Sequence, residues 1–280
     1  MSSAGSSGRP PLSPSEGIPL TASIEGPDDA PALILGNPIG TTTAIWDAQV
    51  RLLRNDYRLL RFELRGHGEP GARSAAPPGP YSIAELGTDV LGLMRDHGIA
   101  TAAYCGISLG GMIGLWLAAN APDRISSLIA CCTAITPMPS RQAWLDRAVL
   151  VRSQGLAAIA EAIPSRWFTP DFIACQPRAV AAVMDMLLGT DPEGYAGCGE
   201  AIADLDLGPV LASVKAPTLV IAGADDVAAP PWQGARTALG IADSRLTVIR
   251  GTAHLAPYQT PGPVNAAILA HLAATTRWPS

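Results

Sequence analysis

The stretch Gly106-Ile107-Ser108-Leu109-Gly110 places a serine between two glycines, after an apolar strand-like run and before a helix-forming run. Such a turn holds the serine in a strained conformation, which requires neighbours without side-chain bulk. Leu109 would then begin a helix, and its N–H would face the oxygen on which negative charge develops during acyl transfer. We therefore predict Ser108 as a nucleophile and Leu109 as an oxyanion donor; the alternative is an ordinary turn of small residues.

A serine nucleophile needs a general base, and the chain contains four histidines. His254 follows a strand-like run and comes after both the serine and an acidic turn, which gives the chain order serine, acid, histidine. His97 and His271 fall on predicted helices, where packing or surface roles are expected. His67 lies in a glycine-bracketed turn that precedes the serine. His254 is therefore the predicted base.

The acidic partner is expected in Gly223-Ala224-Asp225-Asp226, directly after the apolar run 218–222. We favour Asp226, because the Gly-x-x-Asp spacing lets the chain leave the strand before the carboxylate turns inward. Asp225 is the alternative, and a solvated turn is a third interpretation. Ser108, Asp226 and His254 stand at three strand ends in this chain order, a combination far more specific than any one member.

The elements that must position these residues alternate between strand-like and helix-like runs. The strands are expected at residues 18–24, 32–35, 57–62, 103–107, 125–131, 218–222 and 245–249. The long connections between them imply crossovers and a parallel sheet covered by helices on both faces, so the predicted fold class is α/β. Ligands bind beyond the carboxyl ends of such strands, where the loop 36–41 and Ser108 both fall.

The alternation stops between residues 137 and 206, where four helices are expected at 144–153, 156–163, 177–188 and 194–203. We predict that 137–206 is a helical cap inserted into a core formed by 17–136 and 207–280. Residues 1–16 are rich in Ser, Gly and Pro and are predicted to be a disordered leader.

Composition narrows the class of partner. The net charge is −5 with scattered basic residues, and no apolar run approaches the ~18 residues that span a bilayer, so neither nucleic acid nor membrane is an expected partner. Five cysteines without zinc spacing predict no metal site and no disulfide framework, and indicate a reducing, cytoplasmic location. The expected partner is a small molecule, and the oligomeric state stays open.

From about Ala32 to Leu272 the sequence resembles the α/β-hydrolases, and within them the 3-oxoadipate enol-lactonases of aromatic catabolism, the β-ketoadipate pathway. The resemblance is carried by Asn37–Thr41, Arg65–Gly68, Gly106–Met112, Ala118–Arg124, Arg166–Pro170 and Ala216–Gly223. The Gly-x-Ser-x-Gly piece is shared by the whole superfamily, whereas the Asn-x-x-Gly-Thr loop and the cap Arg-Trp-Phe are narrower.

The resemblance implies an α/β-hydrolase fold with a cap and a cofactor-free serine hydrolase. Ser108, His254 and Asp226 would open a carboxylate-bearing enol-lactone through an acyl-enzyme and release 3-oxoadipate. The carboxylate needs a cation, and the cap arginines are Arg141, Arg147, Arg152 and Arg166. The substrate-binding residues that we name on this basis are Asn37, Trp144, Arg141 and Trp167.

Two positions depart from the family pattern. Pro38 stands where a small polar residue is usual, and proline has no N–H, so the second oxyanion donor is expected to be Ile39 or the Asn37 side chain. Glu63-Leu64 replaces an Asp followed by a small residue. These changes leave two alternatives: an esterase, lactonase or cofactor-free perhydrolase acting on another small ester, and a catalytically weak ligand-binding homologue.

Overall fold

A twisted sheet forms the centre of the protein in the computed structural model, which describes residues 17–69, 71 and 73–276. The predicted disordered leader, 1–16, lies outside these residues. Within them the sheet has seven strands in the order β1-β3-β2-β4-β5-β6-β7, all parallel except β1, which pairs antiparallel with β3. The strands are β1 (Ala22–Glu25), β2 (Ala32–Gly36), β3 (Arg58–Phe62), β4 (Ala102–Ile107), β5 (Ile125–Cys131), β6 (Thr218–Gly223) and β7 (Ser244–Ile249).

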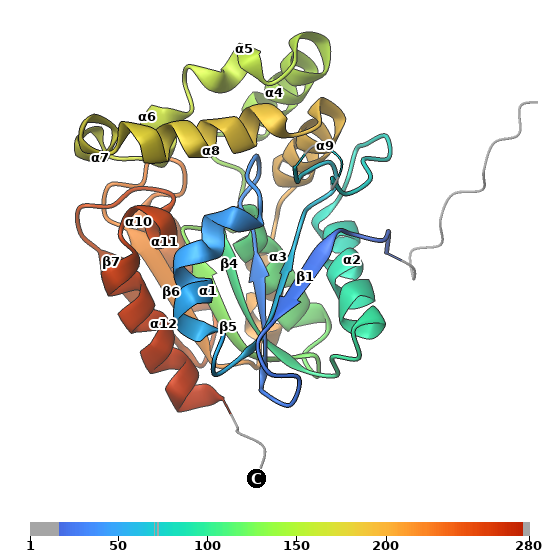
Figure 1. Ribbon diagram of the computed structural model, residues 1–280, viewed down its shortest axis with the longest axis vertical. Coiled ribbons are helices and arrows are strands. Elements are labelled where there is room, and N and C mark those ends of the chain that lie inside the picture. The colour runs from blue at the N-terminus through green and yellow to red at the C-terminus, as the bar shows by residue number, and fades with distance from the viewer. Residues whose placement is uncertain (1–16, 70, 72, 277–280) are drawn as a thin grey trace, which may run out of the picture.

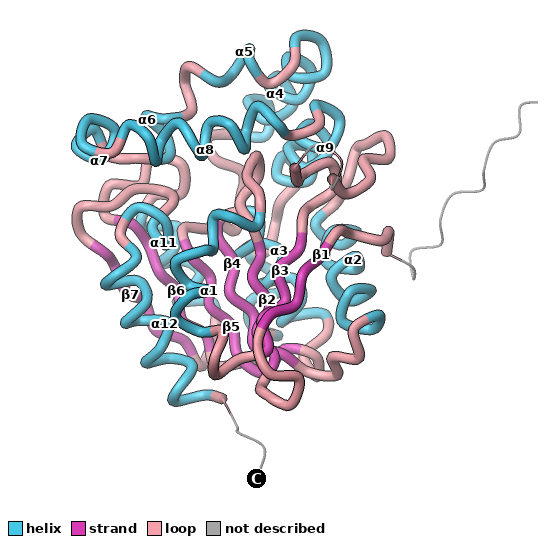
Figure 2. The backbone as a smooth tube through the Cα atoms, viewed as in Figure 1, coloured by secondary structure: helices cyan, strands magenta, loops and turns pink. Residues whose placement is uncertain are grey.

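Helices cover both faces of this sheet (Figures 1 and 2). One face carries η1 (Thr43–Trp46), α1 (Asp47–Leu53), α11 (Ala256–Gln259) and α12 (Pro261–Thr275), and the other carries α2 (Ile83–Asp96), α3 (Leu109–Asn120), η2 (Gly208–Ser213) and α10 (Pro231–Gly240). The central strands are buried on both sides, which explains why they are continuous apolar runs rather than alternating ones. The predicted α/β class and parallel sheet are confirmed.

The predicted first strand is too long. It was expected over 18–24, whereas β1 begins at Ala22, which pairs with Phe62, the last residue of β3. Thr21 still accepts the N–H of Glu63 at 2.8 Å, but its own N–H binds the Ser74 hydroxyl, and Ile18 donates its N–H to Asp89 on α2. The backbone ladder with β3 therefore does not extend back to residue 18.

A layer of helices lies above the carboxyl ends of the strands, at the top of Figure 1. It consists of α4 (Arg141–Gln154), α5 (Ala157–Ala160), α6 (Pro164–Trp167), α7 (Pro170–Cys175), α8 (Pro177–Gly189) and α9 (Pro192–Ala203). The helix expected over 156–163 is shorter, and new helices begin at Pro164 and Pro170, because proline fits the first turn of a helix but not its interior. Within the described residues, none of the helices has the length and apolar character required to span a bilayer.

Candidate functional site

Ser108 occupies a strained turn between β4 and α3. Its φ of 52° and ψ of −115° lie outside the regions that most residues adopt, and its side chain is nearly buried. The flanking glycines are required by close backbone contacts: a Cβ on Gly106 would lie 2.3 Å from the carbonyl of Gly110, and one on Gly110 would lie 2.2 Å from the carbonyl oxygen of Gly36. The turn therefore holds the Ser108 hydroxyl at the N-terminus of α3.

His254 and Asp226 form a hydrogen-bonded pair at the ends of β7 and β6. The distance between His254 Nδ1 and Asp226 Oδ2 is 2.8 Å. Asp226 Oδ1 accepts the N–H groups of Ala228 and Ala229, each at 2.8 Å, so the carboxylate is held on both oxygens. Because the carboxylate accepts a hydrogen bond from Nδ1–H, the ring carries its proton on Nδ1, and Nε2 is the proton-accepting nitrogen. Asp225, the alternative acid, is exposed.

Ser108 and His254 line the same cavity beneath the helical layer. Its other walls include Ile39, Trp144, Arg147, Arg166, Trp167 and Tyr195. The cavity measures ≈ 30 Å³, well below the roughly 300–1,000 Å³ of sites that hold small molecules. The structure is therefore a closed form, in which side chains almost fill the space around the serine.

Two cap arginines, Arg147 and Arg166, face this cavity. Neither forms an ion pair with a carboxylate among the described residues, whereas Arg65, Arg73 and Arg152 each do. Burial, and then the positive charge of Arg147, lowers the pKa of Arg166. Two uncompensated cations beside an apolar wall favour an anionic guest.

The structure corrects the choice of Arg141 as a substrate-binding residue. Its side chain is exposed on the outside of the cap and its Nε donates to Asp204 at 2.7 Å. Arg152 also points elsewhere, since its guanidinium binds Glu193 and Glu200. Spacing does not separate the arginines, because Arg141 and Arg147 each lie three residues from Trp144 on α4. In the structure only Arg147 stacks on the Trp144 ring.

Asn37 is also corrected. Its side chain is fully buried and does not line the cavity, because its Nδ2 donates to Phe62 O at 2.9 Å and to Glu63 Oε2 at 3.3 Å. Glu63 in turn accepts the N–H and hydroxyl of Thr43, each at 3.0 Å, and burial raises the pKa of its carboxyl. The unusual Glu63 thus ties the loop after β2 to β3, and Asn37 is part of that structure.

The oxyanion donors named from the sequence belong to two segments, the start of α3 and the loop after β2. Leu109 is the first residue of α3, so its N–H has no partner within the helix. Ile39 lines the cavity, and its N–H has no hydrogen-bond acceptor among the described residues. The neighbouring Gly40 N–H is already taken by His67 Nε2 at 2.8 Å, a contact that sequence reasoning missed.

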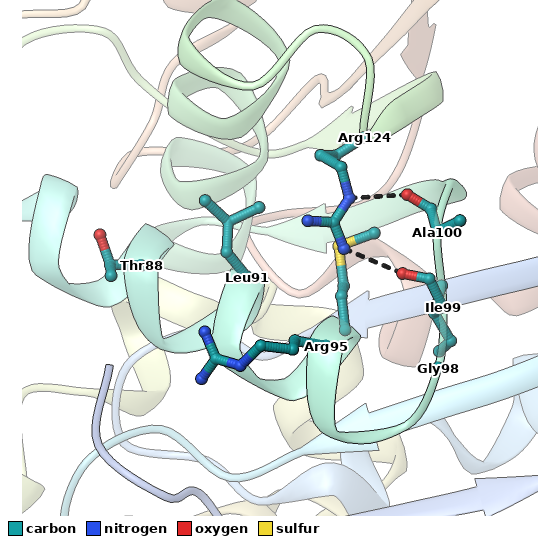
Figure 3. A pocket seen from close by; sticks show the side chains of 8 residues that line it. Thr88, Leu91, Arg95, Gly98, Ile99, Ala100 and Arg124 are labelled. Atoms are coloured by element: carbon teal, nitrogen blue, oxygen red, sulfur yellow. Dashed lines mark hydrogen bonds between the residues drawn. The ribbon is translucent and has the colours of Figure 1, made fainter. Parts of the chain in front are cut away.

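A larger hollow of ≈ 590 Å³ lies far from these residues, beside α2 and the loop that follows it (Figure 3). Arg124 in this hollow donates to the backbone carbonyls of Ala100 and Ile99 at 2.6 and 2.9 Å, so its guanidinium is occupied. Thr88 and Arg95 complete its polar lining, and it holds neither a histidine nor a carboxylate. Among the described residues, no cluster of His, Cys, Asp and Glu is suited to a metal ion.

Comparisons with known proteins agree with this arrangement. A family model described as "alpha/beta hydrolase fold" matches residues 31–261. The chain is 39% identical over 251 residues to 3-oxoadipate enol-lactonase 2 of Acinetobacter baylyi, covering 90% of this chain and 92% of that protein.

Two solved structures extend the likeness to three dimensions. The crystal structure of the enol-lactonase from Burkholderia xenovorans LB400 superposes with a TM-score of 0.87 at 39% identity, covering 91% of this chain and 96% of that one. A thermophilic esterase from Thermogutta terrifontis, solved with malate bound, gives a TM-score of 0.85 at 26% identity over 92% and 94% of the two chains. The serine turn follows β4, and the acid and the histidine follow β6 and β7. Together with the family match and these relatives, this arrangement shows that the chain belongs to the α/β-hydrolase family.

Proposed function

We propose that this protein is a serine hydrolase that opens a small enol-lactone bearing a carboxylate, converting 3-oxoadipate enol-lactone to 3-oxoadipate. The observation that carries the proposal is a single cavity that contains Ser108, His254 and two arginines that form no ion pair with a carboxylate in the described part of the chain. The enol-lactonases among its relatives support the choice of substrate.

In the proposed reaction, His254 Nε2 takes the Ser108 proton as Oγ bonds to the lactone carbonyl carbon. The N–H groups of Leu109 and Ile39 would stabilise the oxyanion. When the intermediate collapses, the ring C–O bond breaks and the enol oxygen takes the proton from His254; the enol then becomes the ketone. A water deprotonated by His254 attacks the acyl carbon, and Ser108 leaves with that proton.

Asp226 would orient the imidazole and stabilise its charged form throughout these steps, because it binds Nδ1 and is itself held by two backbone N–H groups. No cofactor enters this scheme.

Arg147 and Arg166 would bind the free carboxylate of the substrate. A guanidinium binds a carboxylate through two parallel hydrogen bonds, and its plane stacks on aromatic rings. Arg147 is already stacked on Trp144, with Cζ 4.6 Å from the ring centroid, so its orientation is fixed before substrate arrives. Trp144 and Trp167 would provide the apolar walls for the lactone ring.

The proposal also assigns different roles to two parts of the chain, a cap and a core. Residues 137–206 would act as a cap over a core of 17–136 and 207–280, and the small cavity means that the cap must shift to admit substrate. The five free cysteines, four of them buried, fit the predicted cytoplasmic location, where thiols stay reduced.

The test is steady-state hydrolysis of 3-oxoadipate enol-lactone beside a panel of p-nitrophenyl esters, with Ser108→Ala as the control. We expect kcat/KM for the enol-lactone to exceed that for every neutral ester, and the Ser108→Ala protein to lose both activities. Turnover of the esters alone would replace the proposal with a general esterase. Full activity of Ser108→Ala would remove the assigned nucleophile.

A further inference from the structure

The loop after β2 supplies one wall of the proposed oxyanion hole, yet it contains Pro38, which has no N–H to donate. The Gly40 N–H is also excluded as a donor, because it binds His67 Nε2 at 2.8 Å. The Ile39 N–H has no acceptor among the described residues, and Ile39 lines the cavity with Ser108. The Ile39 N–H belongs to the Pro38-Ile39 peptide, whose carbonyl accepts the Thr41 hydroxyl at 3.0 Å. The direction of this N–H depends also on how the adjoining Ile39-Gly40 peptide is held.

His67 is the side chain placed to fix that peptide. It is fully buried, and its two ring nitrogens bridge two backbone segments that are far apart in sequence: Nδ1 lies 2.8 Å from Arg65 O and Nε2 lies 2.8 Å from Gly40 N. A carbonyl oxygen only accepts, so Nδ1 carries the proton and Nε2 accepts from Gly40. Burial lowers the pKa of His67 to about 4, and the ring is neutral at pH 7.

The turn that carries His67 is itself rigid. Arg65 is clamped by Asp89 through two hydrogen bonds of 2.6 and 2.9 Å, and His67 exchanges backbone hydrogen bonds with Leu64 and Ser74. Gly66 donates to Ser74 and accepts the N–H of Asp191, the residue that caps α9. The imidazole thus projects from a fixed base toward Gly40, whose φ of 74° leaves its peptide dependent on outside contacts.

We infer that His67 is a positioning residue for the oxyanion hole: by accepting the Gly40 N–H it holds the loop so that the Ile39 N–H faces the carbonyl attacked by Ser108. The inference deepens the proposed function and rests on it for the nucleophile. His67 makes no contact with the reacting atoms. It holds the Ile39-Gly40 peptide and thereby constrains the preceding Pro38-Ile39 peptide, whose N–H replaces the donor that Pro38 lacks.

Two isosteric replacements separate this role from simple packing. In His67→Asn the amide nitrogen reaches the Nδ1 position and donates to Arg65, but nothing accepts from Gly40. In His67→Gln the amide oxygen reaches the Nε2 position and accepts the Gly40 N–H. The matched control is His271→Asn, because His271 is also buried and its Nε2 lies 2.9 Å from Ser127 Oγ, on α12 and outside the cavity.

The assay uses p-nitrophenyl acetate beside the enol-lactone, so that failure of the substrate proposal does not affect it. Misplacing one oxyanion donor by about 1 Å costs on the order of 10²-fold in rate. We expect His67→Asn to lower kcat about 10- to 100-fold on both substrates with KM within about twofold, and His67→Gln to recover most of the loss. Inhibition by phenylboronic acid, which forms a tetrahedral adduct with serine, should weaken in parallel, and His271→Asn should leave both readouts unchanged.

Three results would overturn the inference. The first is an unchanged kcat in folded His67→Asn. The second is an equal loss in the Asn and Gln variants with phenylboronic acid affinity preserved, which would mean a packing role. If the variants do not fold, ¹⁵N-histidine NMR of the wild-type protein decides: a bare Nε2 supports the inference, and a protonated Nε2 contradicts it. Lack of enol-lactone turnover by wild type with normal ester turnover would instead refute the substrate and leave His67 testable.

Discussion

Arg147 lies over the ring of Trp144, with its guanidinium carbon 4.6 Å from the ring centroid, and both side chains line the cavity that contains Ser108. Stacking of this kind fixes the guanidinium plane while leaving its N–H edge free for a carboxylate. Arg166 brings a second positive charge to the same cavity, and neither arginine has an acidic partner among the described residues. In the proposed function this pair would bind the free carboxylate of the substrate.

Replacing either arginine by methionine should therefore weaken binding of the anionic substrate. A hydrogen bond to a charged group contributes about 1.5–3 kcal/mol, so we expect KM for the enol-lactone to rise about 10- to 100-fold in Arg147→Met and Arg166→Met. The KM for uncharged p-nitrophenyl acetate should change by less than about threefold, because no anion is bound.

Arg236→Met is the matched control for these variants. Arg236 also lies over a tryptophan, Trp232, at 5.9 Å from the ring centroid, but on the exposed face of α10 and outside the cavity. Its KM values should match those of wild type. An equal rise in KM for the neutral ester in Arg147→Met would contradict the anion-binding role and indicate damage to the cavity wall.

The adjacent acids Asp225 and Asp226 offer a second comparison. Asp226→Asn should lower kcat about 10³- to 10⁴-fold, because an amide no longer fixes the Nδ1-protonated tautomer of His254 or stabilises its charge. Asp225→Asn removes an exposed carboxylate one residue away and should leave kcat within about twofold. Steady-state ester hydrolysis by both proteins measures the difference, and a larger loss in the Asp225 variant would reverse the assignment.

Acid should destabilise the fold partly through His271. Burial, and then the nearby charge of Arg245, lowers the pKa of His271 to about 4 from an ordinary value of 6.5. Between these two pH values the unfolded chain binds a proton that the folded chain does not, so the free energy of unfolding falls as the pH drops from about 6.5 to 4. The contribution of one such histidine is of order 3 kcal/mol.

His271→Gln removes this titration and should flatten that part of the curve, measured by urea unfolding at several pH values between 7 and 4. Other buried groups, including His67, titrate in the same range, so the comparison is the difference between variant and wild type. His97→Gln is the control, because that ring is partly exposed. A variant curve parallel to wild type would show that His271 does not bind its proton in this range.

The sequence by itself determined which groups could do the chemistry and their order along the chain. These are a turn with the nucleophile, a turn with the acid and a loop with the histidine, each directly after an apolar run. These features are local. Gly106 and Gly110 are required by backbone contacts within a few residues of Ser108 or with the neighbouring strand, and the apolar runs identify themselves because strands buried on both faces carry few polar residues. Predicting that the loop after β2 faces Ser108 required only that parallel strands share one carboxyl edge.

Tertiary structure alone decided which side chains around that edge reach the cavity. Arg141 and Arg147 lie on the same helix, α4. Arg141 binds Asp204, which follows α9, whereas Arg147 lines the cavity. The sequence predicts Asn37 as a substrate-binding residue, whereas its amide binds Phe62 and Glu63. His67 is set aside as the base because it precedes Ser108, and only the structure shows that it binds Gly40. Each outcome depends on partners more than 20 residues away in the chain. The pairing of long polar side chains is fixed only when the helices and strands pack, so it leaves no periodic pattern in the sequence.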